Sequence, residues 1–290
     1  MTIRFTKTLI VASAMAFGAL GAGVNASASG GEGTEIQHLD WGFNGPFGKY
    51  DRYAMQRGYK VFREVCSSCH ALEHLSFRHL GEKGGPFYDD NYPNPNDNPI
   101  VKAFAKDFEV PDIDGDSGDP ITRPGIPADK FPLVYPNPIA ASASNGGAIP
   151  PDLSVITKAR SGGADYVYSI LTGFEDPPHD FHLSEGMNYN KAFEGHQIKM
   201  AQPLFDGQVE YDPVKKVTVG HDGEEHVETI APPEATVEQM SRDVVEFLEW
   251  AGDPKMEVRK KLGFATFLYL FVFALLLFMT YKSIWRNVEH

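Results

Sequence analysis

The sequence predicts a mainly α-helical domain with long loops, a small β-hairpin and one transmembrane helix near its C-terminal end. Three observations predict this fold. Apolar residues recur at helical spacing in two segments, near residues 52–70 and 236–254. The chain of 290 residues holds 28 Gly and 21 Pro, which favours long irregular connections. An uncharged apolar run fills residues 262–281 and is long enough to cross a bilayer.

The first predicted helix begins after Asp51, a residue type that favours the N-cap position. Within it, Met55, Tyr59, Phe62 and Cys66 recur at spacings of four, three and four residues. Such spacing places side chains on one face of a helix, so we expect this face to pack on the core. The helix is expected to carry both cysteines of the chain to the core side.

The middle of the chain is expected to be rich in loops. Residues 84–151 are dominated by Pro, Gly, Asn and Asp, with one short helix expected around 100–108. Two further short helices are expected within 151–160 and 164–174, joined by Ser-Gly-Gly. Alternating residues between 207 and 230 predict a small β-hairpin.

The strongest helix signal follows Thr236. Thr236 and Gln239 form a capping-box pattern at the start, and Gly-Asp-Pro at 252–254 is typical of a helix end. An apolar stripe at helical spacing lies between them and predicts burial of one face. The stripe consists of Val237, Met240, Val244, Phe247, Leu248 and Ala251.

The apolar run near the C-terminus predicts a membrane anchor. Twenty residues without a charge lie between Lys261 and Lys282. At about 1.5 Å rise per residue they span roughly 30 Å, the thickness of a bilayer core. Tyr281 and Trp285 lie where an interfacial aromatic belt is expected. We assign residues 259–282 to this transmembrane helix.

The N-terminal residues have the features of an export signal. Arg4 and Lys7 form a basic region, residues 9–24 are small and apolar, and Ala-Ser-Ala at 26–28 fits a cleavage site. A first transmembrane helix is the alternative, but glycines interrupt the apolar run. Residues 1–28 are therefore predicted to be a cleaved signal peptide.

Two signals for membrane orientation disagree. More basic residues precede the anchor than follow it, and the positive-inside rule alone would keep the N-terminal side in the cytoplasm. A cleaved signal followed by a long domain overrides that rule, because long domains translocate largely regardless of charge. Residues 29–258 are expected outside the cytoplasm, and residues 283–290 form a cytoplasmic tail.

The exported segment is strongly acidic. Residues 29–258 hold 38 of the 39 acidic residues of the chain but only 19 of its 26 basic residues. Nucleic acid and anionic lipid surfaces are therefore poor partners for this domain. A basic protein or a cation fits better, with association helped by electrostatic steering.

The two cysteines stand in Cys-Ser-Ser-Cys-His at residues 66–70. A thioredoxin-like redox pair needs a βαβ context, a zinc site needs two further ligands at a fixed spacing, and a disulfide across two residues is strained. The sequence around the cysteines has no βαβ pattern and no further ligands at zinc-site spacing, and strain makes the disulfide uncommon. Cys-x-x-Cys-His is the attachment motif of c-type haem, in which the thiols bind the vinyl groups and His70 binds the iron. Export agrees, because c-type haem is attached outside the cytoplasm.

The second axial ligand must come from elsewhere in the chain. Thioether ligation closes the iron to small molecules, which suits electron transfer. Met187 and Met200 are both expected in loops, and Met200 is favoured because a Pro-containing stretch follows it. Propionates need cationic or hydroxyl partners. Arg160 and Tyr166, around the Ser-Gly-Gly turn, are candidates, and Arg123 is another.

Four motifs together make the chain resemble the cytochrome c1 family in its bacterial form. They are GPFGKYDRYAMQRGYKVFREVCSSCHAL, NGGAIPPDLSVITKARSGGADYVYSILTGFEDPP, IKMAQPLFDG and SRDVVEFLEWAGDPK. They occur in the order of the family and precede a single C-terminal helix. The resemblance covers most of residues 38–290, and is loose over 84–145 and 208–232.

The resemblance implies a class I cytochrome c-like haem domain with long loop insertions. It implies one haem c bound through Cys66 and Cys69, with His70 as the proximal iron ligand. Met200, in the Met-Ala-x-Pro motif of the family, is implied as the distal ligand, and Arg160 matches its propionate-binding arginine. Tyr166, Pro150 and Pro151 are implied to line the haem.

The resemblance also implies a function. The chain would accept one electron from the Rieske iron–sulfur protein and pass it to a soluble or anchored cytochrome c. It would do so beside cytochrome b, in a dimeric ubiquinol–cytochrome c oxidoreductase of a bacterial inner membrane, and it would not be catalytic alone. The alternatives are a membrane-anchored cytochrome c shuttle or oxidase-associated subunit, a haem peroxidase with an open iron site, and a thiol oxidoreductase without haem.

Overall fold

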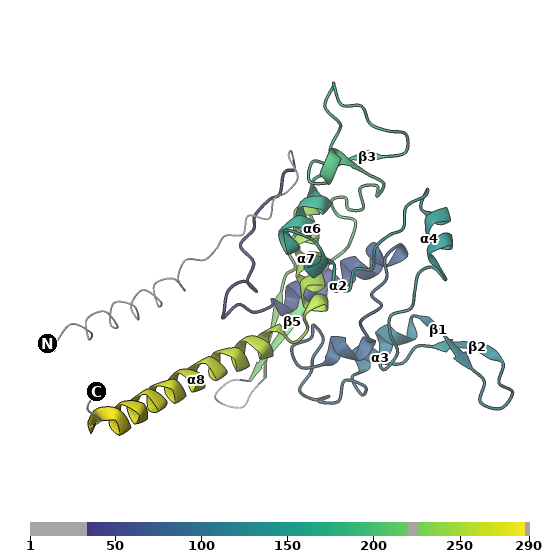
Figure 1. The fold of residues 1–290 in the computed structure, drawn as a ribbon. Helices are drawn as coiled ribbons and strands as arrows, with labels where there is room; N and C mark the ends of the chain where they lie inside the picture. Colours follow the sequence, from purple (N-terminus) through teal and green to yellow (C-terminus); the bar gives the residue numbers. More distant parts are fainter. Residues whose placement is uncertain (1–33, 220–224, 288–290) are drawn as a thin grey trace.

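A computed structural model of the protein describes residues 34–219 and 225–287. The predicted signal peptide, residues 1–28, lies outside the described residues. The described fold is mainly helical, as predicted (Figure 1). The α-helices are α2 (Arg52–Glu64), α3 (Pro99–Lys106), α4 (Pro138–Ser144), α5 (Ile156–Ala159), α6 (Gly163–Thr172), α7 (Val237–Gly252) and α8 (Met256–Ile284). Short 3-10 turns are η1 (Cys66–Ser68), η2 (Phe77–Gly81), η3 (Glu194–His196) and η4 (Trp285–Asn287).

The strands form separate antiparallel pairs. They are β1 (Glu109–Ile113) with β2 (Pro120–Pro124), β3 (Asn188–Tyr189) with β4 (Gln197–Ile198), and β5 (Val214–Val219) with β6 (Glu225–Ile230). The β5–β6 pair confirms the predicted hairpin, although residues 207–212 of its predicted range form no strand. The β1–β2 hairpin occupies a region predicted as loop, so that prediction was wrong there.

The core forms where α2 crosses α7. The predicted inward face of α2 is confirmed, because Met55, Tyr59 and Phe62 are buried. A Cβ atom added to Gly58 would lie 2.0 Å from the backbone oxygen of Asp243. The two helix backbones therefore touch at a position where only glycine fits.

Charged groups are buried at the same crossing. The guanidinium of Arg57 donates to both carboxylate oxygens of Asp243, at 2.8 and 2.7 Å, and the Asp243 side chain is 1% exposed. Glu246, one turn further along α7, accepts a hydrogen bond from the backbone N–H of Asp51 at 2.8 Å. Burial raises the pKa of Glu246 to about 7. Two carboxylates of α7 thus face α2: Asp243 pairs with Arg57, and burial favours the neutral form of Glu246.

Helix α8 leaves the rest of the chain as a long rod (Figure 1). It is the one helix of the described residues that is long and apolar enough to cross a membrane, and it is exposed along that stretch. The predicted anchor, residues 259–282, lies inside it.

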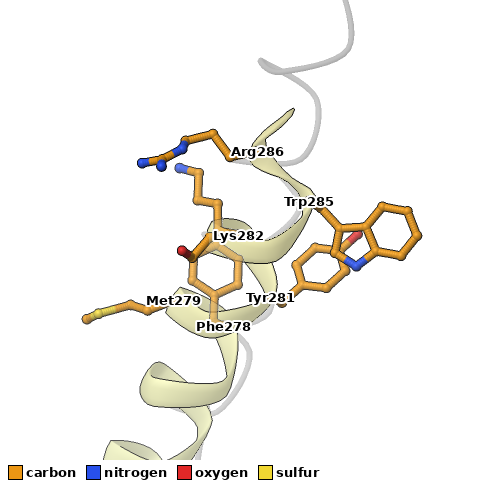
Figure 2. Close-up of a pocket in the computed structure, with 7 residues that line it drawn as sticks. Phe278, Met279, Tyr281, Lys282, Trp285 and Arg286 are labelled. Carbon is orange, nitrogen blue, oxygen red and sulfur yellow. The ribbon is translucent and has the colours of Figure 1, made fainter. Parts of the chain in front are cut away.

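The C-terminal end of α8 carries the expected interfacial residues. Figure 2 shows Lys282 and Arg286 pointing to one side and the rings of Tyr281 and Trp285 lying together on the other. The two ring centroids are 6.2 Å apart. The hollow between these side chains is lined by residues 278–286 of one continuous segment, with no second element to enclose a ligand. It resembles a membrane-interface helix end rather than a binding site.

Candidate haem site

The two cysteines lie on a tight turn directly after α2. The predicted helix was too long, because α2 ends at Glu64 and the chain tightens into η1. The backbone N–H groups of Cys69 and His70 both donate to the carbonyl of Cys66, at 3.1 and 2.9 Å. The Ser67 hydroxyl donates to the Arg63 carbonyl at 2.6 Å and so competes with helix continuation. Both cysteine side chains are half-buried. Cys66 packs against the core, as predicted, whereas Cys69 lines a surface cleft.

His70 is held in one orientation by a backbone carbonyl. Its Nδ1 lies 2.7 Å from the carbonyl oxygen of Pro151. A carbonyl accepts only, so Nδ1 carries the proton and Nε2 keeps a lone pair for a metal. Burial lowers the pKa of His70, against smaller opposing effects of the Pro151 hydrogen bond and Asp152. The neutral imidazole is the form that binds iron.

The segment that supplies this carbonyl is tied to the haem-binding segment at further points. The backbone N–H of Leu153 donates to Ala71 at 2.9 Å. The backbone N–H of Glu73 donates to the Asp152 carboxylate at 2.8 Å. Sequence reasoning placed Pro151 only as a lining residue, because no side-chain signal reveals a carbonyl that orients a histidine.

A partly apolar cleft of about 200 Å³ opens beside Cys69. Pro150 lines it together with residues 133–138 and Ile149, and the carboxylate-bearing Glu73 and Asp152 also line it. The 133–138 stretch was missed, because its Pro-rich sequence has no periodic pattern. A thiol pair and an imidazole with a free Nε2 on one turn, next to a partly apolar cleft, fit the attachment of a flat apolar ring that carries a metal.

The thiols themselves argue against a redox pair. Burial raises the pKa of Cys66 to about 12, and proximity to Cys69 adds to the shift. Thiol oxidoreductases need the opposite, a cysteine whose pKa is lowered toward neutrality. The thiol-oxidoreductase alternative therefore lacks the electrostatic environment that it requires.

The structure brings the two candidate methionines together. Strand β3 starts after Met187 and β4 ends two residues before Met200, and Asn188 pairs with Ile198. The antiparallel ladder therefore places both methionines at the same end, and both are half-buried. Geometry alone does not choose between Met187 and Met200.

A buried asparagine holds this methionine-bearing hairpin. The side chain of Asn190 donates to the Ile170 carbonyl of α6 at 2.7 Å and accepts from the N–H of Ala192 at 3.0 Å. Its backbone N–H donates to the carbonyl of His196 at 3.1 Å. His196 has the positive φ of 58°, and its ring lies 5.7 Å from that of Tyr189. Sequence reasoning missed Asn190, since nothing in one sequence marks an asparagine as buried.

Arg160 and Tyr166 lie together around the Ser-Gly-Gly turn. Gly162 has φ 85°, and a Cβ there would lie 3.1 Å from the Cβ of Tyr166. Burial raises the pKa of Tyr166, and the nearby Arg160 charge opposes that shift. Arg160 is exposed. Arg123, the other candidate, is engaged by two carboxylates, Asp112 at 2.5 Å and Asp129 at 2.7 Å, so the structure disfavours it.

Comparison with known proteins shows the family of the chain. The sequence matches the Cytochrome C1 family over residues 41–288. It is 36% identical to cytochrome c1 of Rhodospirillum rubrum over 98% of each chain, and 38% identical to cytochrome c1 of Blastochloris viridis over 99% of this chain and 97% of the other. It is 47% identical to the cytochrome b/c1 of Bradyrhizobium diazoefficiens over 85% of this chain, which spans about a third (35%) of that relative. The chain therefore belongs to the cytochrome c1 family of electron-transfer haem proteins and carries its haem c on Cys66 and Cys69.

Proposed function

We propose that this chain is the haem c subunit of a ubiquinol–cytochrome c oxidoreductase, the cytochrome bc1 complex. It receives one electron from the Rieske iron–sulfur protein and delivers it to a cytochrome c. The observation that carries the proposal is the Cys-x-x-Cys-His turn whose His70 is oriented by the Pro151 carbonyl at 2.7 Å. Cytochrome b as a partner is supported by the relative named cytochrome b/c1, which joins both names in one protein.

The residues divide the work of holding the cofactor. Haem c, when bound, supplies a one-electron iron couple. Cys66 and Cys69 would hold the ring at the η1 turn, and His70 would bind the iron through Nε2. Met200 would be the second iron ligand, supported by its Met-Ala-x-Pro sequence, which Met187 lacks. With both His70 and Met200 bound, the iron would have no open position, unlike that of a peroxidase.

The remaining predicted residues are proposed to contact the propionates and the faces of the haem ring. Arg160 and Tyr166 are proposed to bind the propionates, supported by the Gly162 turn that brings them together. Pro150 and Pro151 are proposed to pack on the ring, and Pro150 lines the cleft beside Cys69. Electron transfer asks for no general acid, base or nucleophile from these side chains.

The domain arrangement follows from the two ends of the chain. Residues 1–28 are a cleaved signal, 29–258 a periplasmic haem domain, 259–282 the anchor in a bacterial inner membrane, and 283–290 a cytoplasmic tail. The exposed apolar helix α8 supports the anchor. Protease added to spheroplasts is expected to digest the haem domain from outside; protection of the domain would contradict this orientation.

The axial ligand is tested by two matched variants. Met200→Leu is expected to leave the haem attached, to lower its reduction potential and to let the ferrous iron bind carbon monoxide. Met187→Leu is the control, since Met187 lies at the same end of the β3–β4 ladder with similar burial. If Met187→Leu gives these changes and Met200→Leu does not, the assignment is wrong.

The partners are tested by purification and by salt. In mild detergent the chain is expected to co-purify with cytochrome b and the Rieske protein as a dimeric complex, whereas an independent shuttle would come alone.

The acidic haem domain is proposed to dock a basic cytochrome c. The rate at which the complex reduces cytochrome c should fall as salt rises from about 0.05 to 0.2 M, because the Debye length shortens to about 8 Å and screens the attraction. A flat salt response would remove the docking proposal.

A further inference from the structure

Residues 43–50 form a tight turn next to the start of α8. The backbone N–H of Lys49 donates to the Gly42 carbonyl at 2.9 Å, and Gly45 has φ 73°. At the base of the turn, Phe43 is buried and stacks on Trp41 with ring centroids 5.3 Å apart. The turn is therefore closed by its own backbone and anchored in the core.

The same turn is fastened to the first two turns of α8. The backbone N–H of Tyr50 donates to the Glu257 carboxylate at 3.0 Å. The Lys260 ammonium donates to the carbonyl of Phe43 at 2.5 Å. Both ends of the turn are thus bound to α8, the predicted membrane anchor. The position of the tip along the axis of α8 is therefore fixed.

The tip of the turn is Phe47, whose side chain has little cover. Phe47 is 72% exposed, and its ring lies 5.5 Å from the ring of Phe264 on α8. Phe264 stands three residues beyond Lys261, the last charged residue before the apolar run. Three residues of helix advance about 4.5 Å, so the Phe47 ring lies where the hydrocarbon of the bilayer begins.

We propose that the 43–50 turn is a second membrane contact of this chain, in which Phe47 inserts into the lipid interface beside α8. The exposed Lys49 reaches the lipid phosphates from the same turn. Phe and Lys occur together in segments that lie at the membrane interface, with the apolar ring toward the acyl chains and the charge toward the headgroups. The surface that Phe47 occupies continues the exposed apolar surface of α8, which argues for lipid as its neighbour. Two contacts, helix and turn, then fix the tilt of the haem domain on the membrane.

A depth measurement tests the lipid contact. A spin label at Phe47→Cys, in the complete complex in phosphatidylcholine nanodiscs, reports collisions with oxygen, which enters lipid, and with a water-soluble nickel chelate. The complex without an introduced cysteine, treated with the same reagent, gives the background signal. The control is Ile113→Cys, 67% exposed on β1, a hairpin that points away from α8 (Figure 1). The oxygen-to-nickel ratio at position 47 is expected to be several-fold higher than at 113. A nickel-accessible label, or one shielded from both reagents by a partner subunit, would overturn the proposal.

A second measurement tests the tilt and does not depend on the label. The spread of haem-plane orientations in oriented bilayers is read from the electron paramagnetic resonance of the complex. Phe47→Gln is expected to widen the spread, and Phe47→Leu, which keeps an apolar tip, is expected to preserve it. Equal spreads in Phe47→Gln and the unaltered protein would overturn the role in tilt. Neither test requires electron transfer, so both stand apart from the proposed function.

Discussion

The two sides of the haem site are supported in different ways. On the His70 side, the cysteine turn follows directly from α2, which packs on α7 over the main core. On the side of Met200, the proposed second iron ligand, support comes from two-residue strands and from one buried amide, Asn190. The first side depends on the packing of the whole domain, and the second on a few local hydrogen bonds. Damage to the core should therefore unfold the domain, whereas damage to the hairpin should affect the proposed methionine ligand alone.

The largest expected effect is at the helix crossing. Gly58→Ala would place a Cβ 2.0 Å from the Asp243 oxygen and 2.8 Å from the Cβ of Phe247, so α2 and α7 must separate. In an isolated helix this change would be stabilising by about 1 kcal/mol. Here overpacking against backbone should cost about 3 kcal/mol or more. Thermal unfolding of the purified complex, followed by haem absorbance, measures it.

Gly115→Ala is the matched control. Nothing lies within 4 Å of a Cβ added at this hairpin position. Its unfolding temperature should match that of the unaltered protein. If Gly58→Ala is as stable as Gly115→Ala, the close helix crossing is absent in solution.

The same contrast explains what could be predicted from the sequence. Helices α2 and α7 were predictable because Met55, Tyr59, Met240 and Val244 recur at the helical period that burial imposes. The cysteine turn was predictable because haem attachment requires one spacing. The end of α2 was misplaced because the Ser67 hydroxyl donates to the Arg63 carbonyl. This is a local hydrogen bond, and the spacing of apolar residues gives no sign of it.

The rest of the site depends on contacts that leave no pattern. Pro151 acts through its carbonyl, so its side chain gives no sign of the role. Hairpin β1–β2 contains Pro111 and three aspartates near its turn, a composition typical of loops, and an ion pair of Arg123 with Asp112 helps to close it. Met187 and Met200 lie at the same end of the hairpin only because β3 pairs with β4. Strands of two residues are too short to show an alternating pattern in the sequence.

The next effect should be confined to the methionine side. Asn190→Ala leaves the buried Ile170 carbonyl and Ala192 N–H without the partners that Asn190 supplies, at a cost of about 1–3 kcal/mol. The hairpin should loosen and the ferric absorption band typical of methionine–iron ligation should weaken, while the haem stays attached. Near-ultraviolet dichroism of the core serves as the control readout. If the core signal is lost together with the band, the two sides are not independent.

The core also carries a pH dependence. Glu246 is 5% exposed and its pKa is raised from 4.5 to about 7, chiefly by burial and further by Asp51 and Asp243, against the Asp51 N–H bond and Arg242. The folded protein therefore holds this proton more tightly than the unfolded chain does. Between pH 4.5 and about 7, stability should fall as pH rises, by at most about 1.4 kcal/mol per unit, and then level off.

Glu246→Gln should remove this slope, because its amide oxygen can still accept from Asp51 and carries no charge. Chemical unfolding of the complex at a series of pH values measures it. The exposed Glu238→Gln, on the same helix, is the control and should keep the slope. A slope that persists in Glu246→Gln would assign the titration to another group.

The smallest effect separates the two asparagines of the methionine hairpin. Asn188 is half-buried, and its amide donates to the Lys199 carbonyl at 3.4 Å, near the limit for a hydrogen bond. Asn188→Ala should change stability by less than about 0.5 kcal/mol, because water can replace the lost donor. Its methionine–iron band should match that of the unaltered protein. Asn188 adjoins the ladder end that carries Met200, whereas Asn190 lies further away but is buried. If Asn188→Ala nevertheless weakens the band more than Asn190→Ala, proximity to the ligand matters more than burial, and Asn190 is not the residue that holds the hairpin.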